Sequence, residues 1–235
     1  MAAMPAATEI PVPTNGKINR VLTAALFSVV TVLVLLAVYP FVLSAVLFGI
    51  LFDNKRRRFV DRVVQAWARG TMVFFGAKIQ VFGLENLPPI DEPVMYTPNH
   101  CSFLDIFVLS GYLPRPCKYI SKIEILRIPL IGWAMAFAKH IAIRRMDRAS
   151  QLKTLKDAIE TLKDGNSLVT FPEGTRSKDG RLLDFKKGAF TMASRAGVRV
   201  VPITIVGTHL YQPPGAFVPL AVPRGVRIII HPPLD

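Results

Sequence analysis

The chain of 235 residues is long enough to bury a core, so one domain with an appended segment is expected. Its formal net charge is +13, from 29 basic and 16 acidic residues, and 51% of its residues are hydrophobic. The basic residues are scattered and form no recognised nucleic-acid motif, which argues against a nucleic-acid partner. The two cysteines, Cys101 and Cys117, lack metal-type spacing, so neither a disulfide framework nor a zinc site is predicted.

The N-terminal part divides into a polar stretch and a long apolar one. Residues 1–20 contain three prolines and a glycine and are predicted to be disordered. Residues 21–52 carry no charge and account for much of the mean hydropathy of +0.38. As one helix they would run about 48 Å, well beyond a hydrocarbon core of roughly 30 Å. Because Pro40 divides the segment, two membrane-embedded forms stay open: one tilted, kinked helix or a hairpin of two shorter helices.

Four consecutive basic residues, 55–58, follow the apolar segment directly. The positive-inside tendency places this flank and the domain behind it on the cytosol-like side of a membrane. Basic residues beside a membrane segment commonly meet anionic lipid, so membrane lipid is an expected partner. Residues 53–76 are predicted to form an amphipathic connecting helix, with apolar side chains at helical spacing that pack on the core or lie on the lipid surface.

From residue 77 to residue 235, predicted strands alternate with predicted helices. The strands are expected at 78–82, 93–97, 118–120, 141–144, 167–171, 199–206 and 225–230. The helices are expected at 103–112, 129–138, 149–163 and 186–196. This alternation predicts an α/β fold with a mixed, largely parallel sheet flanked by helices, preceded by the membrane-embedded helix or hairpin.

The first polar cluster, residues 99–105, follows a predicted strand and contains His100 and Asp105. On an ideal helix, residues five apart lie about 140° around the axis and do not touch. They can meet if His100 precedes a helix and Asp105 lies in its first turn, with Ser102 as the N-cap. Asp105 would then accept the Nδ1–H of the imidazole and leave Nε2 as a base. The alternative is that Asp105 only caps the start of the helix.

The second cluster, residues 171–177, also follows a predicted strand. Arg176 can grip a phosphate with two hydrogen bonds, and Gly174 lets the backbone approach closely. Glu173 can bind a substrate hydroxyl or orient Arg176, and Thr175 adds a hydroxyl. The alternative is an ordinary turn with a surface Glu–Arg pair. Ligands bind at the carboxyl ends of strands in α/β sheets, so the coincidence of both clusters at such ends favours a site.

A base and an anion-binding group together suit acyl transfer to a phosphorylated alcohol. An alcohol attacks a thioester poorly unless its proton is removed, and an imidazole with a pKa of about 6.5 suits that task. Two more basic segments can complete the anion site, namely Lys122 and the pair Arg144–Arg145. Cys101 and Ser102 invite a covalent hydrolase interpretation, but no Gly-x-Ser-x-Gly elbow supports it.

The chain resembles the glycerolipid acyltransferases over roughly residues 78–232, and in particular the 1-acylglycerol-3-phosphate (lysophosphatidic acid) acyltransferase family. Four motifs carry the resemblance in the family's order: Asn99-His100-x4-Asp105, Lys139-His140-Ile141-Ala142-Ile143-Arg144-Arg145, Phe171-Pro172-Glu173-Gly174-Thr175-Arg176 and Val201-Pro202-Ile203-Thr204-Ile205. In the second motif Lys139 stands where the family usually has a glycine, which puts the choice of Arg145 over Arg144 in doubt. Residues 132–135 and 144–151 resemble the plastid-type branch of plants and algae.

The resemblance implies a catalytic domain at 77–235 that transfers a fatty acyl group to the sn-2 hydroxyl of lysophosphatidic acid. It implies that His100 is the base, that Asp105 is its partner, and that Glu173, Gly174 and Arg176 bind the glycerol phosphate with Arg145. It implies acyl-CoA or acyl carrier protein as donor and no metal or tightly bound cofactor. A ternary mechanism without an acyl-enzyme is expected, because the acceptor alcohol is itself the nucleophile.

Two alternative functions stay open. One is an acyltransferase acting on another lysophospholipid or on glycerol 3-phosphate, and the other is a catalytically silent, lipid-binding membrane protein. The location is a membrane, of either the plastid envelope or the endoplasmic reticulum. Residues 1–20 hold one arginine and no serine, so they do not resemble a transit peptide.

Overall fold

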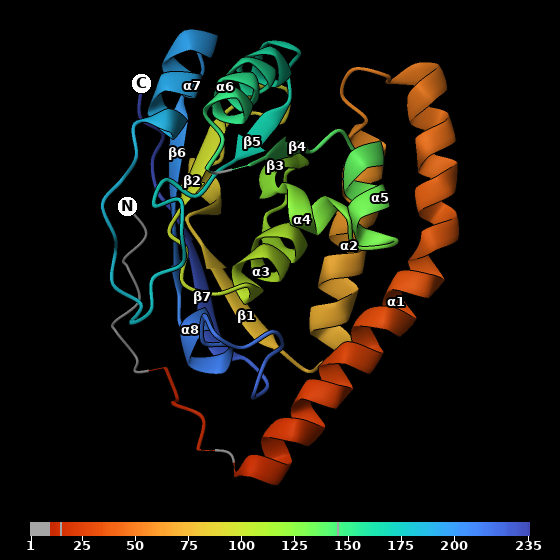
Figure 1. Ribbon diagram of the computed structural model, residues 1–235, viewed down its shortest axis with the longest axis vertical. Coiled ribbons are helices and arrows are strands. Elements are labelled where there is room, and N and C mark those ends of the chain that lie inside the picture. Colours follow the sequence, from red (N-terminus) through yellow and green to blue (C-terminus); the bar gives the residue numbers. More distant parts are fainter. Residues whose placement is uncertain (1–9, 15, 145) are drawn as a thin grey trace.

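The computed structural model describes residues 10–14, 16–144 and 146–235, and its centre is a seven-stranded sheet (Figure 1). The strands are β1 (Lys78–Phe82), β2 (Met95–Pro98), β3 (Cys117–Lys122), β4 (Ile141–Ile143), β5 (Ser167–Val169), β6 (Val200–Val206) and β7 (Arg224–Ile230). Their order across the sheet is β1-β7-β6-β2-β5-β3-β4. All seven predicted strands are therefore confirmed, with ends that move by a few residues.

Neighbouring strands run parallel everywhere except between β6 and β7, which are antiparallel. The five strands β6, β2, β5, β3 and β4 consequently point the same way, and their carboxyl ends share one edge of the sheet. This confirms the predicted mixed, largely parallel sheet.

Helices cover both faces of the sheet. Apart from the N-terminal helix α1 (Lys17–Phe52), the main helices are α2 (Arg58–Phe74), α3 (Leu104–Tyr112), α5 (Ile131–Phe137), α6 (Arg148–Lys163) and α7 (Gly188–Ala196). Successive strand residues point to opposite faces. Accordingly Tyr96 packs in a core with α2 and α3, whereas Met95 packs in a second core with α6 and α7. The α2–α3 contact is close, because a Cβ on Gly111 would lie 2.9 Å from the backbone of Arg69.

The apolar segment forms one continuous helix, α1 (Lys17–Phe52), in place of a hairpin. It lies on the outer side of α2 in Figure 1, and the Trp67 indole N–H of α2 donates to the Thr31 carbonyl of α1 at 3.2 Å. Its buried residues form a stripe toward the protein: Phe27, Leu35, Val42, Ala45 and Gly49. By length and composition α1 can cross a membrane, and only 11% of its most apolar window is buried.

Several boundaries differ from the predictions. Helix α1 begins at Lys17, so residues 17–20 are helical and the predicted disordered stretch is too long there; residues 1–9 and 15 lie outside the described part of the chain. The predicted connecting helix begins at Arg58, and it packs between α1 and α3 as a part of the core. Three short helical segments were not predicted, because they are shorter than a helical period can reveal: η1 (Leu84–Asn86), α4 (Ile123–Leu126) and α8 (Thr208–Tyr211).

Candidate functional site

The two predicted polar clusters emerge side by side at the shared carboxyl edge of the sheet. Strand β2 pairs in parallel with β5, with Tyr96 opposite Val169, so the segments after both strands leave at the same level. Strand β6 flanks β2 on its other side, with Thr97 opposite Pro202. The segments after β2, β5 and β6 therefore form one contiguous site.

His100 and Asp105 meet as predicted. The imidazole Nδ1 of His100 lies 2.9 Å from Asp105 Oδ2, and the Asp105 carboxylate is fully buried in the first turn of α3. The helix begins at Leu104 and its N-cap residue is Phe103, so the prediction of Ser102 as N-cap is wrong. Ser102 still serves the start of the helix, because its hydroxyl accepts the N–H of Leu104 at 3.1 Å.

The Asp105 carboxylate also organises the loop before the helix. Its Oδ2 accepts the backbone N–H groups of Cys101 and Ser102, each at 2.9 Å. Its Oδ1 accepts the hydroxyl of Thr208 at 2.5 Å, from the segment after β6. The two interpretations of Asp105 therefore hold together: it orients the imidazole and it satisfies the start of the helix. The Nδ1–H donates to this carboxylate, which leaves Nε2 of His100 with an available lone pair.

Two further contacts fix the position of His100. Its ring stacks on Phe171, with the ring centroids 3.8 Å apart and the planes at 21°. The neighbouring Asn99 side chain accepts the N–H of Ile205 at 2.6 Å and donates to the carbonyl of the same residue at 3.0 Å. The loop after β2 is thereby attached to β6 and to the segment after β5.

Glu173 is buried, with 2% of its surface exposed, and both of its oxygens accept backbone N–H groups. Oε1 accepts from His100 at 2.6 Å, and Oε2 accepts from Leu183 at 2.9 Å. Within the described residues Glu173 forms no ion pair with Arg176, so the surface Glu–Arg pair considered above is not present. Instead, the carboxylate joins the loop after β2 to the segment after β5.

The turn after Glu173 places the remaining motif residues toward solvent. Gly174 has a φ of +69°, in the left-handed region that favours glycine. A Cβ at this position would lie 2.7 Å from Nζ of Lys186. Thr175 is exposed and Arg176 is partly exposed, and the guanidinium has no ion pair or hydrogen bond with any residue that the structure describes. Such a group can receive an anion.

The other predicted basic residues are less closely connected to His100. Lys122 ends β3 and is exposed, and Arg144 follows β4. These strands lie two and three positions from β2, or about 10 and 14 Å at the usual strand spacing. Arg145 lies outside the described residues, so its role stays a prediction. Lys139 has a φ of +58°, which costs roughly 1 kcal/mol and explains the glycine that the family usually has there.

Neither candidate for a covalent nucleophile is suited to that task. The thiol of Cys101 is buried, and burial together with the negative charge of Asp105 raises its pKa to about 12. The thiolate that would attack is therefore scarce at neutral pH. Ser102 is fully buried, and its hydroxyl donates to the carbonyl of Gln212 at 2.8 Å.

Sequence reasoning missed three contributors to the site: Thr208, Leu183 and the ring of Phe171. Thr208 had a usable signal, because it is a polar residue just after the predicted strand at 199–206 and therefore belongs to the same edge. Leu183 contributes only its backbone N–H, which no residue pattern reveals. Phe171 was part of a motif, but its stacking on His100 depends on how two loops meet.

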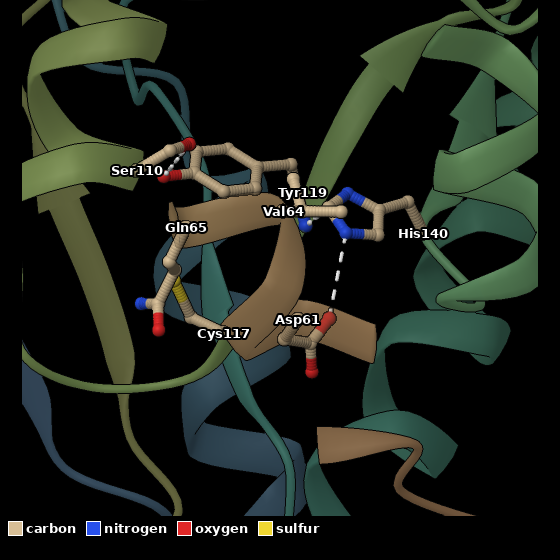
Figure 2. Close-up of a pocket in the computed structure, with 7 residues that line it drawn as sticks. All are labelled: Asp61, Val64, Gln65, Ser110, Cys117, Tyr119 and His140. Atoms are coloured by element: carbon tan, nitrogen blue, oxygen red, sulfur yellow. Dashed lines mark hydrogen bonds and ion pairs between the residues drawn. The ribbon is translucent and has the colours of Figure 1, made fainter. Parts of the chain in front are cut away.

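A second buried polar cluster lies where α2 faces β3 and the start of β4, and Figure 2 shows Asp61 and His140 of this cluster. Nζ of Lys118 is 2.5 Å from Oδ2 of Asp61, and Nε2 of His140 is 3.6 Å from its Oδ1. His140 precedes β4, and its side chain is only 4% exposed and stacks on Tyr119. Burial lowers the pKa of both Lys118 and His140, an effect that Asp61 opposes.

Comparison with known proteins agrees with this arrangement. A sequence model of the family described as Acyltransferase matches residues 78–206, more than half of the chain. The chloroplastic 1-acyl-sn-glycerol-3-phosphate acyltransferase LPAT1 of Arabidopsis thaliana is 49% identical over 187 residues, which are 80% of this chain and 52% of that protein. A 1-acyl-sn-glycerol-3-phosphate acyltransferase of Chlamydomonas reinhardtii is 47% identical over 181 residues, which are 77% of this chain and 53% of that protein.

A solved structure also matches. The crystal structure of the 1-acyl-sn-glycerophosphate (LPA) acyltransferase PlsC from Thermotoga maritima superposes with a TM-score of 0.77 at 29% identity, covering 93% of this chain and 87% of that one. The chain spans about half the length of the curated plant and algal relatives it matches. The family match includes both motifs that meet at the sheet edge, and on these grounds the chain belongs to the Acyltransferase family.

Proposed function

We propose that this chain transfers a fatty acyl group from acyl-CoA or acyl carrier protein to the sn-2 hydroxyl of lysophosphatidic acid, giving phosphatidic acid. The observation that carries the proposal is the His100–Asp105 pair, held directly beside the motif that contains Arg176. The names of the relatives support the choice of acceptor, because each is a 1-acyl-sn-glycerol-3-phosphate acyltransferase.

The proposed mechanism uses His100 as a general base. Nε2 removes the proton of the acceptor hydroxyl while its oxygen attacks the thioester carbonyl. The carbon–sulfur bond then breaks, and the leaving thiolate takes the proton from the imidazolium. Asp105 stabilises the imidazolium through Nδ1. The buried, protonated thiol of Cys101 and the buried hydroxyl of Ser102 support a direct transfer without an acyl-enzyme.

The binding roles follow from exposure and charge. Arg176 binds the acceptor phosphate, and Gly174 and Thr175 line the same turn. Lys122, at the end of β3, supplies further positive charge, and Arg145, which lies outside the described residues, is proposed to do the same. Glu173 contributes through the backbone, since its carboxylate holds the His100 loop against the motif.

A membrane setting fits these substrates, because acceptor and product both reside in a bilayer. Helix α1 can hold the chain at that surface. We place it in a plastid membrane, since relatives from Arabidopsis thaliana and Brassica napus are named chloroplastic.

The test measures transfer of a labelled acyl group from acyl-CoA or acyl carrier protein to lysophosphatidic acid. It uses membranes that contain the wild type, His100→Ala or His231→Ala at matched expression. His231 is a suitable control because it follows antiparallel β7, and its Nε2 lies 2.7 Å from the Thr204 hydroxyl. We expect His100→Ala to lose about 100- to 10,000-fold in rate and His231→Ala to stay near the wild type. Undiminished transfer by His100→Ala would refute the base, and no transfer by the wild type would refute this acceptor.

A further inference from the structure

Lys186 lies against Gly174 of the motif at residues 171–176, although it comes 12 residues later in the chain. A Cβ built on Gly174 would lie 2.7 Å from Nζ of Lys186, 3.0 Å from its Cε and 3.1 Å from its Cδ. The end of the lysine side chain therefore occupies the space that the missing side chain of Gly174 leaves open. Figure 1 shows the connecting segment as the cyan loop that precedes α7.

Backbone hydrogen bonds hold Lys186 at this place. Its own N–H donates to the carbonyl of Pro172 at 2.9 Å, on the other side of Glu173. The N–H of Leu183 donates to the Glu173 carboxylate at 2.9 Å. Between these two attachments the ring of Phe185 stacks on Phe190, with centroids 6.3 Å apart. The segment is therefore anchored to the motif at two points, and the position of Lys186 follows from these anchors.

The charge of Lys186 is not neutralised inside the protein. The side chain is exposed, and among residues 10–14, 16–144 and 146–235 it forms no ion pair or hydrogen bond. Glu173 is the carboxylate of the motif, but its two oxygens are occupied by backbone N–H groups. Arg176, two residues after Gly174, is also unpaired within the described chain. One cation in contact with Gly174 and another two residues along the chain, neither with a counter-ion among the described residues, are suited to an anionic ligand.

We propose that Lys186 binds the phosphate of the acceptor together with Arg176. This inference rests on the proposed function. A phosphomonoester carries about −1.5 to −2 charges at pH 7, so one guanidinium leaves it incompletely neutralised. Lysine acts on phosphate as a point charge, which complements the planar fork of arginine.

The geometry favours the acceptor over the donor as the source of this phosphate. In lysophosphatidic acid the reacting hydroxyl and the phosphate are on neighbouring carbons of one glycerol. In acyl-CoA the long pantetheine arm separates the thioester from the phosphates. Lys186 lies against Gly174, and Gly174 directly follows Glu173, whose carboxylate accepts the backbone N–H of His100, so few residues separate the lysine from the proposed base.

The experiment compares Lys186→Met with Lys187→Met in steady-state assays. Methionine keeps the apolar stem of lysine and removes only the charge. Lys187 is the adjacent exposed lysine, and the three atoms nearest to a Cβ on Gly174 all belong to Lys186, so Lys187 is a matched control. The acceptors are lysophosphatidic acid and 1-monoacylglycerol, which lacks the phosphate, and the KM of the acyl donor is measured separately.

We expect Lys186→Met to raise the KM for lysophosphatidic acid about tenfold or more, with the donor KM and the rate on 1-monoacylglycerol within about twofold. Lys186→Arg should restore most of the affinity, and Lys187→Met should resemble the wild type. An unchanged acceptor KM in Lys186→Met would overturn the proposal, as would a rise confined to the donor KM. An inactive wild type would instead reject the proposed function, so the two failures are distinguishable.

Discussion

At the level of single residues, the proposed base His100 depends on Asp105, a carboxylate that accepts several hydrogen bonds. Asp105 is fully buried and accepts hydrogen bonds from His100, from two backbone N–H groups and from Thr208. A buried carboxylate oxygen without a partner is costly, so each donor stabilises the orientation that the imidazole needs. Among these donors in the described chain, only Thr208 comes from outside the loop after β2, because it is the first residue of α8, in the segment after β6.

Thr208→Val tests this dependence, because valine keeps the shape of threonine and removes the hydroxyl. We expect kcat to fall about tenfold, the size of a lost charge-assisted hydrogen bond, with both KM values within twofold. The control is Thr204→Val on β6, whose hydroxyl pairs with His231 at 2.7 Å, outside the site. Equal rates for Thr208→Val and the wild type, or equal losses in both variants, would show that Thr208 does not orient Asp105.

The pairing of His100 with Asp105 could be predicted because residue type and spacing restrict it to one arrangement, a histidine before a helix and a carboxylate in its first turn. The role of Glu173 could not. Its partners are the backbone N–H groups of His100 and Leu183, and every residue other than proline carries such a group. The sequence therefore marks Glu173 as important while leaving its contact open.

At the level of elements, the alternation of strands and helices could be predicted from the sequence, because each strand is a short run of residues that become buried and is bounded by a turn. Helix α1 was ambiguous because Pro40 removes one backbone donor. The structure keeps the helix continuous through Pro40, although the carbonyl of Leu36 cannot receive the N–H that proline lacks. Prolines are tolerated in membrane helices when nearby groups satisfy the freed backbone, which sequence alone does not reveal.

Helix α2 contains a feature that its apolar pattern conceals. Asp61 lies in its first turn but is only 3% exposed, because it faces Lys118 of β3 and His140 before β4. These groups attach the helix to the two outer strands. The other titratable groups around His140 are Tyr119 and Cys117, whose pKa values burial raises.

The cluster predicts a stability that decreases on acidification. Burial lowers the pKa of His140 below its usual 6.5. As the pH falls through 6.5, the unfolded chain binds a proton that the folded chain does not, so the free energy of unfolding decreases. One histidine limits this slope to about 1.4 kcal/mol per pH unit. The melting temperature in detergent should therefore fall between pH 7.5 and pH 5.5, and the fall should be smaller in His140→Gln than in His231→Gln. Equal falls in both variants would contradict the assignment.

At the level of the whole molecule, two forces can hold the chain on a membrane. One is the positive charge of +13, which attracts anionic lipid over about a Debye length. The other is the outward surface of α1, where large apolar side chains are half exposed or more, among them Leu33 at 60% and Leu36 at 54%. Figure 1 places this helix at the periphery, with α2 between it and the rest of the protein.

These two forces separate in high salt. At 1 M NaCl the Debye length is about 3 Å, so attachment by charge is lost while burial of α1 in lipid persists. We expect membranes washed in 1 M NaCl to retain the wild type and to release it only with non-ionic detergent. Leu33→Arg with Leu36→Arg, in the middle of α1, should weaken retention because each central arginine costs roughly 2.5 kcal/mol or more. Val21→Arg with Leu22→Arg is the control, since long side chains near a helix end reach the interface. Release of the wild type by salt alone would mean that charge, and not α1, holds the protein on the membrane.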